Sequence, residues 1–457
     1  MTFLTHWRSQ PGFLSQGYSD IEAINVLLGY FLRDRESSNP LNGESLLSQN
    51  PEFAWGSGAP LEKVINCDEE LLHLTQEPWL MRNAIAVLEP WEHVGFNHFG
   101  EGVRASLNVA YLNQTIADCD SILFPLWSMG IPDLNRLVPL LMSGVAIVFE
   151  GGDSSCRDAS SFEPSAASLE EYHQLIDRLL LSRTPNSAPC IFICIGHQLV
   201  GQSHIYLLKR AVATILETTE LAGDRNGKAL RTLQHLAKRI QALGESLEIH
   251  KGCGEQQTVT AKGWDHPEFV VGLNEVQELG GRRLRPYESP DSEESHIPEE
   301  LIVAHDITAD ELEGVIDTSL AYEREVKISM FHSDEVNQEA LLLANWAYRE
   351  LHNTIIPHRH ILAGSQLAWL LQLPYAVEIL ASTCFEDAVV TECAATCIYY
   401  KDFESHRIRR SFSCQFHPEL LEDLRGVGAR MPPSYQYLKQ DDGARLFARL
   451  LYAGLQD

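Results

Sequence analysis

A short apolar run of this chain ends in a thiol followed by a glycine: Cys190-Ile191-Phe192-Ile193-Cys194-Ile195-Gly196-His197-Gln198. Because β-branched and other apolar residues fill the run, it predicts a buried strand. Gly196 would allow a sharp turn, and residues 199–219 carry apolar side chains at helical spacing. The pattern predicts a strand–turn–helix unit with Cys194 at the junction, where the helix dipole favours a thiolate.

A second segment, Gln415-Phe416-His417-Pro418-Glu419, places an imidazole 223 positions after the thiol (417 − 194 = 223). His417 and Glu419 stand two residues apart, across a proline. With Cys194 they supply a nucleophile, a base and an acid that orients the base, which is the smallest set for acyl transfer through a thioester. Taken alone, Cys194 is better explained as a buried structural cysteine, as most cysteines of apolar strands are.

As a pair, and in their order along the chain, the two segments resemble the class I (triad) glutamine amidotransferase family. In the first segment the resemblance is carried by Gly196-His197-Gln198 after Cys194. It implies that Cys194 is the nucleophile, His417 the general base and Glu419 the residue that orients the base. It also implies that Gln198 helps to hold the substrate.

Further positions match the contacts that this family makes with its substrate and oxyanion. Gly151 and Gly152 fall where the family has a glycine loop, whose backbone N–H groups form the oxyanion hole together with that of Ile195. Glycine lets the backbone approach a developing oxyanion closely. His332 and Ser333 match a His-Ser-type loop that contacts the bound glutamine. Without the resemblance, a glycine pair indicates only a turn that ends a strand.

Strand-like and helical segments alternate along the chain. Strands are expected at 83–90, 119–127, 144–150, 190–195, 374–383 and 389–400, and helices at 100–117, 133–142, 169–181 and 199–219. Such alternation predicts an α/β fold with a mostly parallel sheet flanked by helices. The order of elements also matches the amidotransferase family, which implies a flavodoxin-like core with an inserted α+β segment.

Four regions follow from this organisation. They are an N-terminal extension at 1–80, a first part of the core with the nucleophile at 81–219, an insertion at 220–322, and a second part with His417 and Glu419 at 323–457. Within the second part, a helical insertion is expected at 337–371, around Ile356-Pro357. In the insertion, residues 229–243 have the pattern of an amphipathic helix, whereas 285–300 are acidic and rich in Pro and Ser, which is typical of an exposed loop.

Two residues depart from the family pattern. Phe192 stands two residues before the nucleophile, where the family usually has glycine, and its ring could narrow the glutamine pocket or shift the turn. Asp153 replaces the proline that usually follows the glycine pair. A carboxylate that pointed at the oxyanion site would oppose the negative charge there.

Other histidines are weaker candidates for chemistry. His197 adjoins the nucleophile but lacks the His-x-Glu pairing, so we interpret it as structural. His358 and His360 alternate as two metal ligands of one strand would, but no third ligand is evident. We therefore expect no metal site, and the amidotransferase chemistry calls for no cofactor.

Composition excludes several classes of partner. The chain has 457 residues with 63 acidic and 35 basic side chains, which gives a formal charge of −28. Such a charge repels nucleic acid and anionic membranes, and no uncharged run reaches membrane-spanning length. The ten cysteines include no CxxC pair, and the N-terminus lacks a signal-peptide pattern. We expect a cytoplasmic protein that binds neither nucleic acid nor membranes.

The resemblance implies hydrolysis of the glutamine side-chain amide and delivery of ammonia to an acceptor that the sequence does not identify. No synthase domain is recognisable, so a separate synthase subunit could bind the acceptor substrate. Alternatively, the protein is a stand-alone hydrolase of γ-glutamyl amides. A third alternative, from a different class, is a non-catalytic binding or regulatory subunit that keeps the fold.

Overall fold

The computed structural model describes most of the chain after residue 67. The described residues are 65, 68–90, 109–110, 112–113, 119–152, 154–182, 187–222, 227–251, 258–275, 281–287, 296–304, 326–329, 332, 334–362, 364–385, 388–402, 407–419 and 442–455. Most of the predicted N-terminal extension and of the helix at 100–117 lies outside them, as do Asp153 and Ser333.

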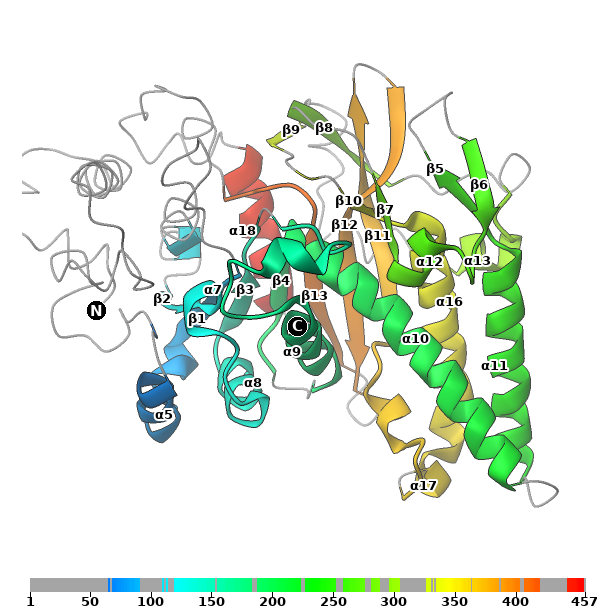
Figure 1. Ribbon diagram of the computed structural model, residues 1–457. Helices are drawn as coiled ribbons and strands as arrows, with labels where there is room; N and C mark the ends of the chain where they lie inside the picture. Colours follow the sequence, from blue (N-terminus) through cyan, green and yellow to red (C-terminus); the bar gives the residue numbers. More distant parts are fainter. Residues whose placement is uncertain are drawn as a thin grey trace, which may run out of the picture.

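A mixed sheet forms the centre of the molecule (Figure 1). Within the described residues it has nine strands, in the order β2-β1-β3-β4-β13-β12-β11-β8-β9. The parallel strands are β1 (Ala84–Glu89), β2 (Asp120–Pro125), β3 (Ala146–Phe149), β4 (Cys190–Ile193) and β13 (Ile408–Cys414). Antiparallel pairing continues through β12 (Ala388–Lys401), β11 (Ala376–Phe385), β8 (Gly281–Pro286) and β9 (Val326–Ser329). The predicted α/β class, with parallel strands and flanking helices, is confirmed.

Helices cover both faces of the parallel half. One face packs against α8 (Leu134–Met142), α9 (Leu169–Leu181) and α10 (Ile195–Ala222), and the other against α18 (Asp442–Leu455). Every residue of β1, β3 and β4 is buried. Strands that are covered on both faces need such continuous apolar runs, which explains the apolar segments of the sequence.

Capping side chains fix where helices begin. Ser168 precedes α9 and forms a capping box with Glu171, so the helix occupies the predicted range. Asn337 precedes α16 (Gln338–Ile355), and its side chain accepts a hydrogen bond from the N–H of Ala340. Both caps satisfy N–H groups that have no acceptor within the helix.

The helix after the thiol begins earlier than predicted. α10 starts at Ile195, directly after Cys194, rather than near Leu199. Cys194 itself makes the turn, with a φ of +49°, and no other non-glycine residue of the described ranges has a positive φ. The prediction that Gly196 makes the turn is therefore wrong, because Gly196 already lies in the first turn of the helix.

The described parts of residues 220–322 pack against the rest of the fold. α11 (Lys228–Ser246) packs against α10 and α16, and the three helices lie side by side (Figure 1). β8 pairs with β11 and carries β9 at the edge of the sheet. The predicted loop from residue 285 is wrong at its start, because Arg285 pairs with Ser382 of β11.

Shorter elements complete the described part of the chain. They are α5 (Asp68–Gln76), η1 (Met81–Asn83), α7 (Leu126–Met129), η2 (Ala159–Phe162), α12 (Pro267–Val271), α13 (Glu299–Val303), η5 (Ile356–His358), α17 (Arg359–Leu362) and η6 (Ala368–Gln372). Small antiparallel pairs join β5 (Glu248–Lys251) to β6 (Thr258–Lys262) and β7 (Leu273–Glu275) to β10 (Asp334–Val336). Among the described residues, none of the helices has the length and apolar character that crossing a membrane requires.

Candidate active site

Three neighbouring parallel strands end at the candidate residues. β3 leads to Gly151, β4 leads to Cys194, and β13 leads to His417 and Glu419. β4 lies between the other two and pairs with both. Because the carboxyl ends of parallel strands meet at one edge of the sheet, segments far apart in sequence become neighbours there.

Cys194 occupies a strained turn between strand and helix. Its φ of +49° lies in the left-handed region, which is costly for a residue with a side chain. Its N–H donates to the carbonyl of Cys414 at 2.7 Å, and its carbonyl accepts from the N–H of Gln198 at 3.1 Å. These bonds keep the sulfur beside the N-terminus of α10, where the helix dipole favours an anion.

His417 and Glu419 form a hydrogen-bonded pair. The distance between Nδ1 of His417 and Oε1 of Glu419 is 2.7 Å, and the glutamate is fully buried. Burial alone would lower the pKa of His417, but the charges of Cys194 and Glu419, and its hydrogen bonds to both, raise that pKa well above its usual value. The imidazole is thus hydrogen-bonded to the sulfur of Cys194 on one side and to the carboxylate of Glu419 on the other, which is the arrangement that a general base requires.

Gly151 fits closely against both the thiol and the imidazole. A Cβ atom on this residue would lie 2.4 Å from Cε1 of His417 and 3.1 Å from Cβ of Cys194. The carbonyl oxygen of Gly152 is 4.0 Å from Sγ of Cys194, so the glycine loop lies against the sulfur. An oxyanion needs N–H donors rather than this oxygen, so a role for the loop requires its N–H groups to face the substrate.

Gln198 is buried and hydrogen-bonded within the protein. Its Nε2 donates to the backbone carbonyl of Asp334 at 2.8 Å and to Oε1 of Gln415 at 3.4 Å. Nε2 of Gln415 in turn donates to Sγ of Cys194 at 3.7 Å. The Gln198 amide, which was predicted to hold the substrate, therefore belongs to a chain of hydrogen bonds that runs from the sulfur through Gln415 to β10.

The predicted His332-Ser333 loop leads into β10. His332 is partly buried and lies two residues before β10, which pairs with β7. Ser333 lies outside the described residues. Asp334, which was not among the predicted site residues, is 3% exposed and accepts a 2.6 Å hydrogen bond from Oγ of Ser155. Its position two residues after His332 is the sequence signal that could have indicated Asp334.

Both ring nitrogens of His197 contact groups other than Cys194. Its Nδ1 lies 2.7 Å from Oγ of Ser413, and its Nε2 lies 2.9 Å from the carbonyl oxygen of Cys393. The ring is buried between the helix and the sheet. These contacts agree with the interpretation of His197 as a structural residue.

Phe192 belongs to the core beneath the helices. Its ring is fully buried and lies 6.3 Å from that of Phe149, measured between centroids. A Cβ atom on Gly196 would lie 2.9 Å from Cδ1 of Phe149 and 3.3 Å from Cβ of Phe192. The glycine is therefore required because α10 packs closely on two aromatic residues.

Two other thiols lie near Cys194 but are fully enclosed. Burial raises the pKa of Cys156 and of Cys414 well above the usual range of a thiol. Charge adds to this effect, from Asp334 and Cys194 at Cys156, and from Glu419 and Cys194 at Cys414. Both groups therefore stay neutral near pH 7, and neither competes with Cys194 as a nucleophile.

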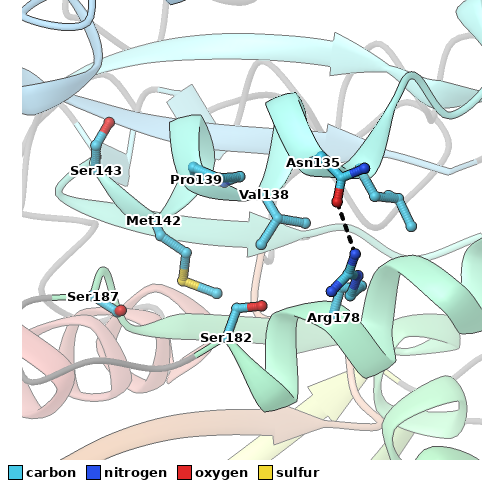
Figure 2. A pocket seen from close by; sticks show the side chains of 9 residues that line it. Asn135, Val138, Pro139, Met142, Ser143, Arg178, Ser182 and Ser187 are labelled. Carbon is cyan, nitrogen blue, oxygen red and sulfur yellow. Dashed lines mark hydrogen bonds between the residues drawn. The ribbon is translucent and has the colours of Figure 1, made fainter.

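A cavity of about 450 Å³ lies between α8 and α9 (Figure 2). Nη2 of Arg178 donates a 2.9 Å hydrogen bond to Oδ1 of Asn135, and both residues line the cavity. Its lining includes Met142, near the start of β3, and Ser187, near the start of β4. The cavity thus lies at the amino ends of these strands, away from Cys194, and is separate from the candidate active site.

The chain matches no known protein-family model and no curated protein. The geometry of Cys194, His417 and Glu419 is therefore the main indication of function. A thiol in a strained strand–helix turn, hydrogen-bonded to a carboxylate-supported imidazole, can attack a carbonyl carbon and form a thioester.

Proposed function

We propose that this protein is a glutamine amidotransferase of the class I type, which hydrolyses the side-chain amide of glutamine through a thioester on Cys194. The observation that carries the proposal is the thiol in its left-handed turn beside a His417–Glu419 pair joined at 2.7 Å. The close fit of Gly151 against thiol and imidazole supports it. The choice of glutamine as substrate is supported by the sequence resemblance in both segments.

The proposed reaction begins with proton transfer from Cys194 to His417. The raised pKa of His417 favours this imidazolium form, which Glu419 stabilises. The thiolate then attacks the amide carbon of glutamine. Backbone N–H groups stabilise the resulting oxyanion, and the candidates are Ile195 at the start of α10 and the Gly151-Gly152 loop.

The intermediate then collapses to products. The carbon–nitrogen bond breaks, and His417 gives its proton to the leaving ammonia. Water, deprotonated by His417, attacks the thioester, releases glutamate and restores the Cys194 thiol. In this proposal the ammonia then passes to an acceptor substrate, which is bound by a synthase subunit or by another segment of the protein.

Release of glutamate from glutamine tests the proposal. We expect release by the wild type, alone or with a candidate synthase subunit, and none by Cys194→Ala. Cys190→Ala removes a buried thiol from the same strand and is expected to keep the activity. No release by the wild type in any combination would exclude glutamine as the substrate, and release that survives in Cys194→Ala would exclude this nucleophile.

A further inference from the structure

Arg157 lies between two buried carboxylates beside the candidate active site. Its Nη1 is 3.7 Å from Oε1 of Glu268, and its Nε is 3.8 Å from Oδ1 of Asp334. The side chains of the two acids are 5% and 4% exposed, and that of Arg157 is 27% exposed. Arg157 follows the Gly151-Gly152 loop, whereas Asp334 begins β10 and Glu268 belongs to α12.

Asp334 connects this ion-pair cluster to the nucleophile. Its Oδ2 accepts a hydrogen bond from Oγ of Ser155 at 2.6 Å. One carboxylate therefore contacts both Ser155 and Arg157, which follow the glycine loop in the sequence. Its backbone carbonyl accepts from Nε2 of Gln198 on α10. One residue therefore contacts the segment that follows the glycine loop through its side chain, and the helix that follows Cys194 through its main chain.

The guanidinium of Arg157 compensates the buried negative charges of Glu268 and Asp334. A buried carboxylate is costly unless a cation or hydrogen-bond donors compensate it, and Arg157 lies within 4 Å of both carboxylates. Nδ1 of His266 lies 3.9 Å from Oε2 of Glu268, and Ser155 donates to Asp334, but Arg157 is the group that connects the two acids. Movement of Arg157 away from Glu268 and Asp334 is therefore strongly disfavoured, which restrains the loop that carries it. Restraint matters because oxyanion donors act only when they are held close to the productive geometry.

We propose that Arg157 is a positioning residue that fixes the Gly151-Gly152 loop against Cys194, through its ion pairs with Glu268 and Asp334. The inference rests on the proposed function, because it takes the loop as a source of oxyanion donors. It gives residues 220–322 a part in the reaction, since this region supplies Glu268.

Two reactions of Cys194 separate this role from a general loss of structure. In acylation by p-nitrophenyl acetate, the sulfur attacks the ester carbonyl, an oxyanion forms, and p-nitrophenolate leaves. In alkylation by iodoacetamide, a sulfur–carbon bond forms while the carbon–iodine bond breaks, and no oxyanion appears. We expect Arg157→Met to slow acylation by about 10- to 100-fold and to leave alkylation within about threefold of the wild type.

Matched variants complete the experiment. Arg157→Lys keeps the charge but not the planar fork that reaches both acids, so we expect an intermediate acylation rate. Glu268→Gln is expected to slow acylation selectively, as Arg157→Met does. Arg136→Met removes an arginine whose side chain is 62% exposed, and it should change neither rate.

The ratio of the two rates decides the outcome. An unchanged ratio of acylation to alkylation in Arg157→Met would overturn the positioning role. A parallel loss of both reactions would also overturn it, because that result indicates a collapsed site. Neither reaction uses glutamine, so a wild type that releases no glutamate contradicts the proposed function while the ratio still tests Arg157.

Discussion

Replacing Gly151 with alanine probes how closely the glycine loop fits against Cys194 and His417. The new Cβ would lie 2.4 Å from Cε1 of His417, whereas ordinary van der Waals contacts begin at 3.4 Å. Either the loop or the imidazole must therefore move by about 1.0 Å (3.4 − 2.4). The 3.1 Å approach to Cβ of Cys194 blocks an easy shift of the loop. A displacement of about 1 Å lowers catalysis by about 100-fold, or about 2.7 kcal/mol of activation free energy (2 × 1.36).

The assay measures the acylation rate of Cys194 and the thermal unfolding of each variant. Gly144→Ala is the control for crowding, because its Cβ would lie 3.1 Å from both the carbonyl of Ala84 and Cε of Met81. Gly144 precedes β3, at the end away from the site, so this variant should lose stability but keep its rate. Gly364→Ala should change neither, because its Cβ would meet nothing within 4 Å.

A Gly151→Ala protein that folds and reacts within about threefold of the wild type would refute this reasoning. It would mean that the imidazole of His417 does not need the position in which it contacts the loop. Equal losses of rate in Gly144→Ala and Gly151→Ala would also refute it, because the effect would then follow from crowding at either end of β3.

Three further predictions concern buried charge. Glu419→Gln removes a charge that raises the pKa of His417, so the variant should be less stable than the wild type when His417 is protonated. The difference in unfolding free energy should be largest below about pH 6.5 and should vanish as pH rises through the raised pKa. Urea unfolding from pH 5 to 9 measures this difference. Burial raises the pKa of Glu339 to about 7, so wild-type stability should fall by about 3 kcal/mol as pH rises from about 4.5 to 7, and Glu339→Gln should abolish this fall. Arg349→Met removes the cation paired with Glu378, whose side chain is 1% exposed, and should lower the unfolding free energy by about 3–5 kcal/mol. Adding Glu378→Gln to this variant should restore most of the loss, because the buried carboxylate is then neutral.

Each of these predictions has a result that would overturn it. A stability difference for Glu419→Gln that grows with pH would reverse the assigned sign. Parallel pH profiles for the wild type and Glu339→Gln would show that this carboxyl does not titrate on folding. A double variant no more stable than Arg349→Met would show that the loss does not arise from a buried, uncompensated charge at Glu378.

The helices α8 and α9 and the parallel strands β1 to β4 could be predicted because their signals are local, whereas β13 and α18 were not predicted. α9 occupies its predicted range because Ser168 and Glu171 mark its start and an apolar stripe marks its face. The turn at the thiol could not be assigned in the same way. Gly196 is the residue type that usually takes an unusual φ, but tertiary bonds such as that from the Cys194 N–H to Cys414 impose the positive φ on Cys194 instead.

Long-range contacts also hid part of the candidate site. Arg157, Glu268 and Asp334 are separated by 111 and 66 positions (268 − 157 and 334 − 268), and ion pairs across such distances leave no periodic pattern. β8 was missed for a similar reason. Its final residues adjoin an acidic, proline-containing stretch, and pairing with β11 is what makes them a strand.

Labelling by a glutamine analogue that carries a chloroketone in place of the amide tests nucleophile and substrate together. A thiolate displaces chloride from such a compound and keeps the label, which mass spectrometry of the digested protein locates. We predict that the label lies on Cys194 in the wild type and in Cys156→Ala, that excess glutamine suppresses it, and that Cys194→Ala remains unlabelled. Label on Cys156, or label on Cys194 that glutamine does not suppress, would contradict the proposed glutamine-hydrolysing triad.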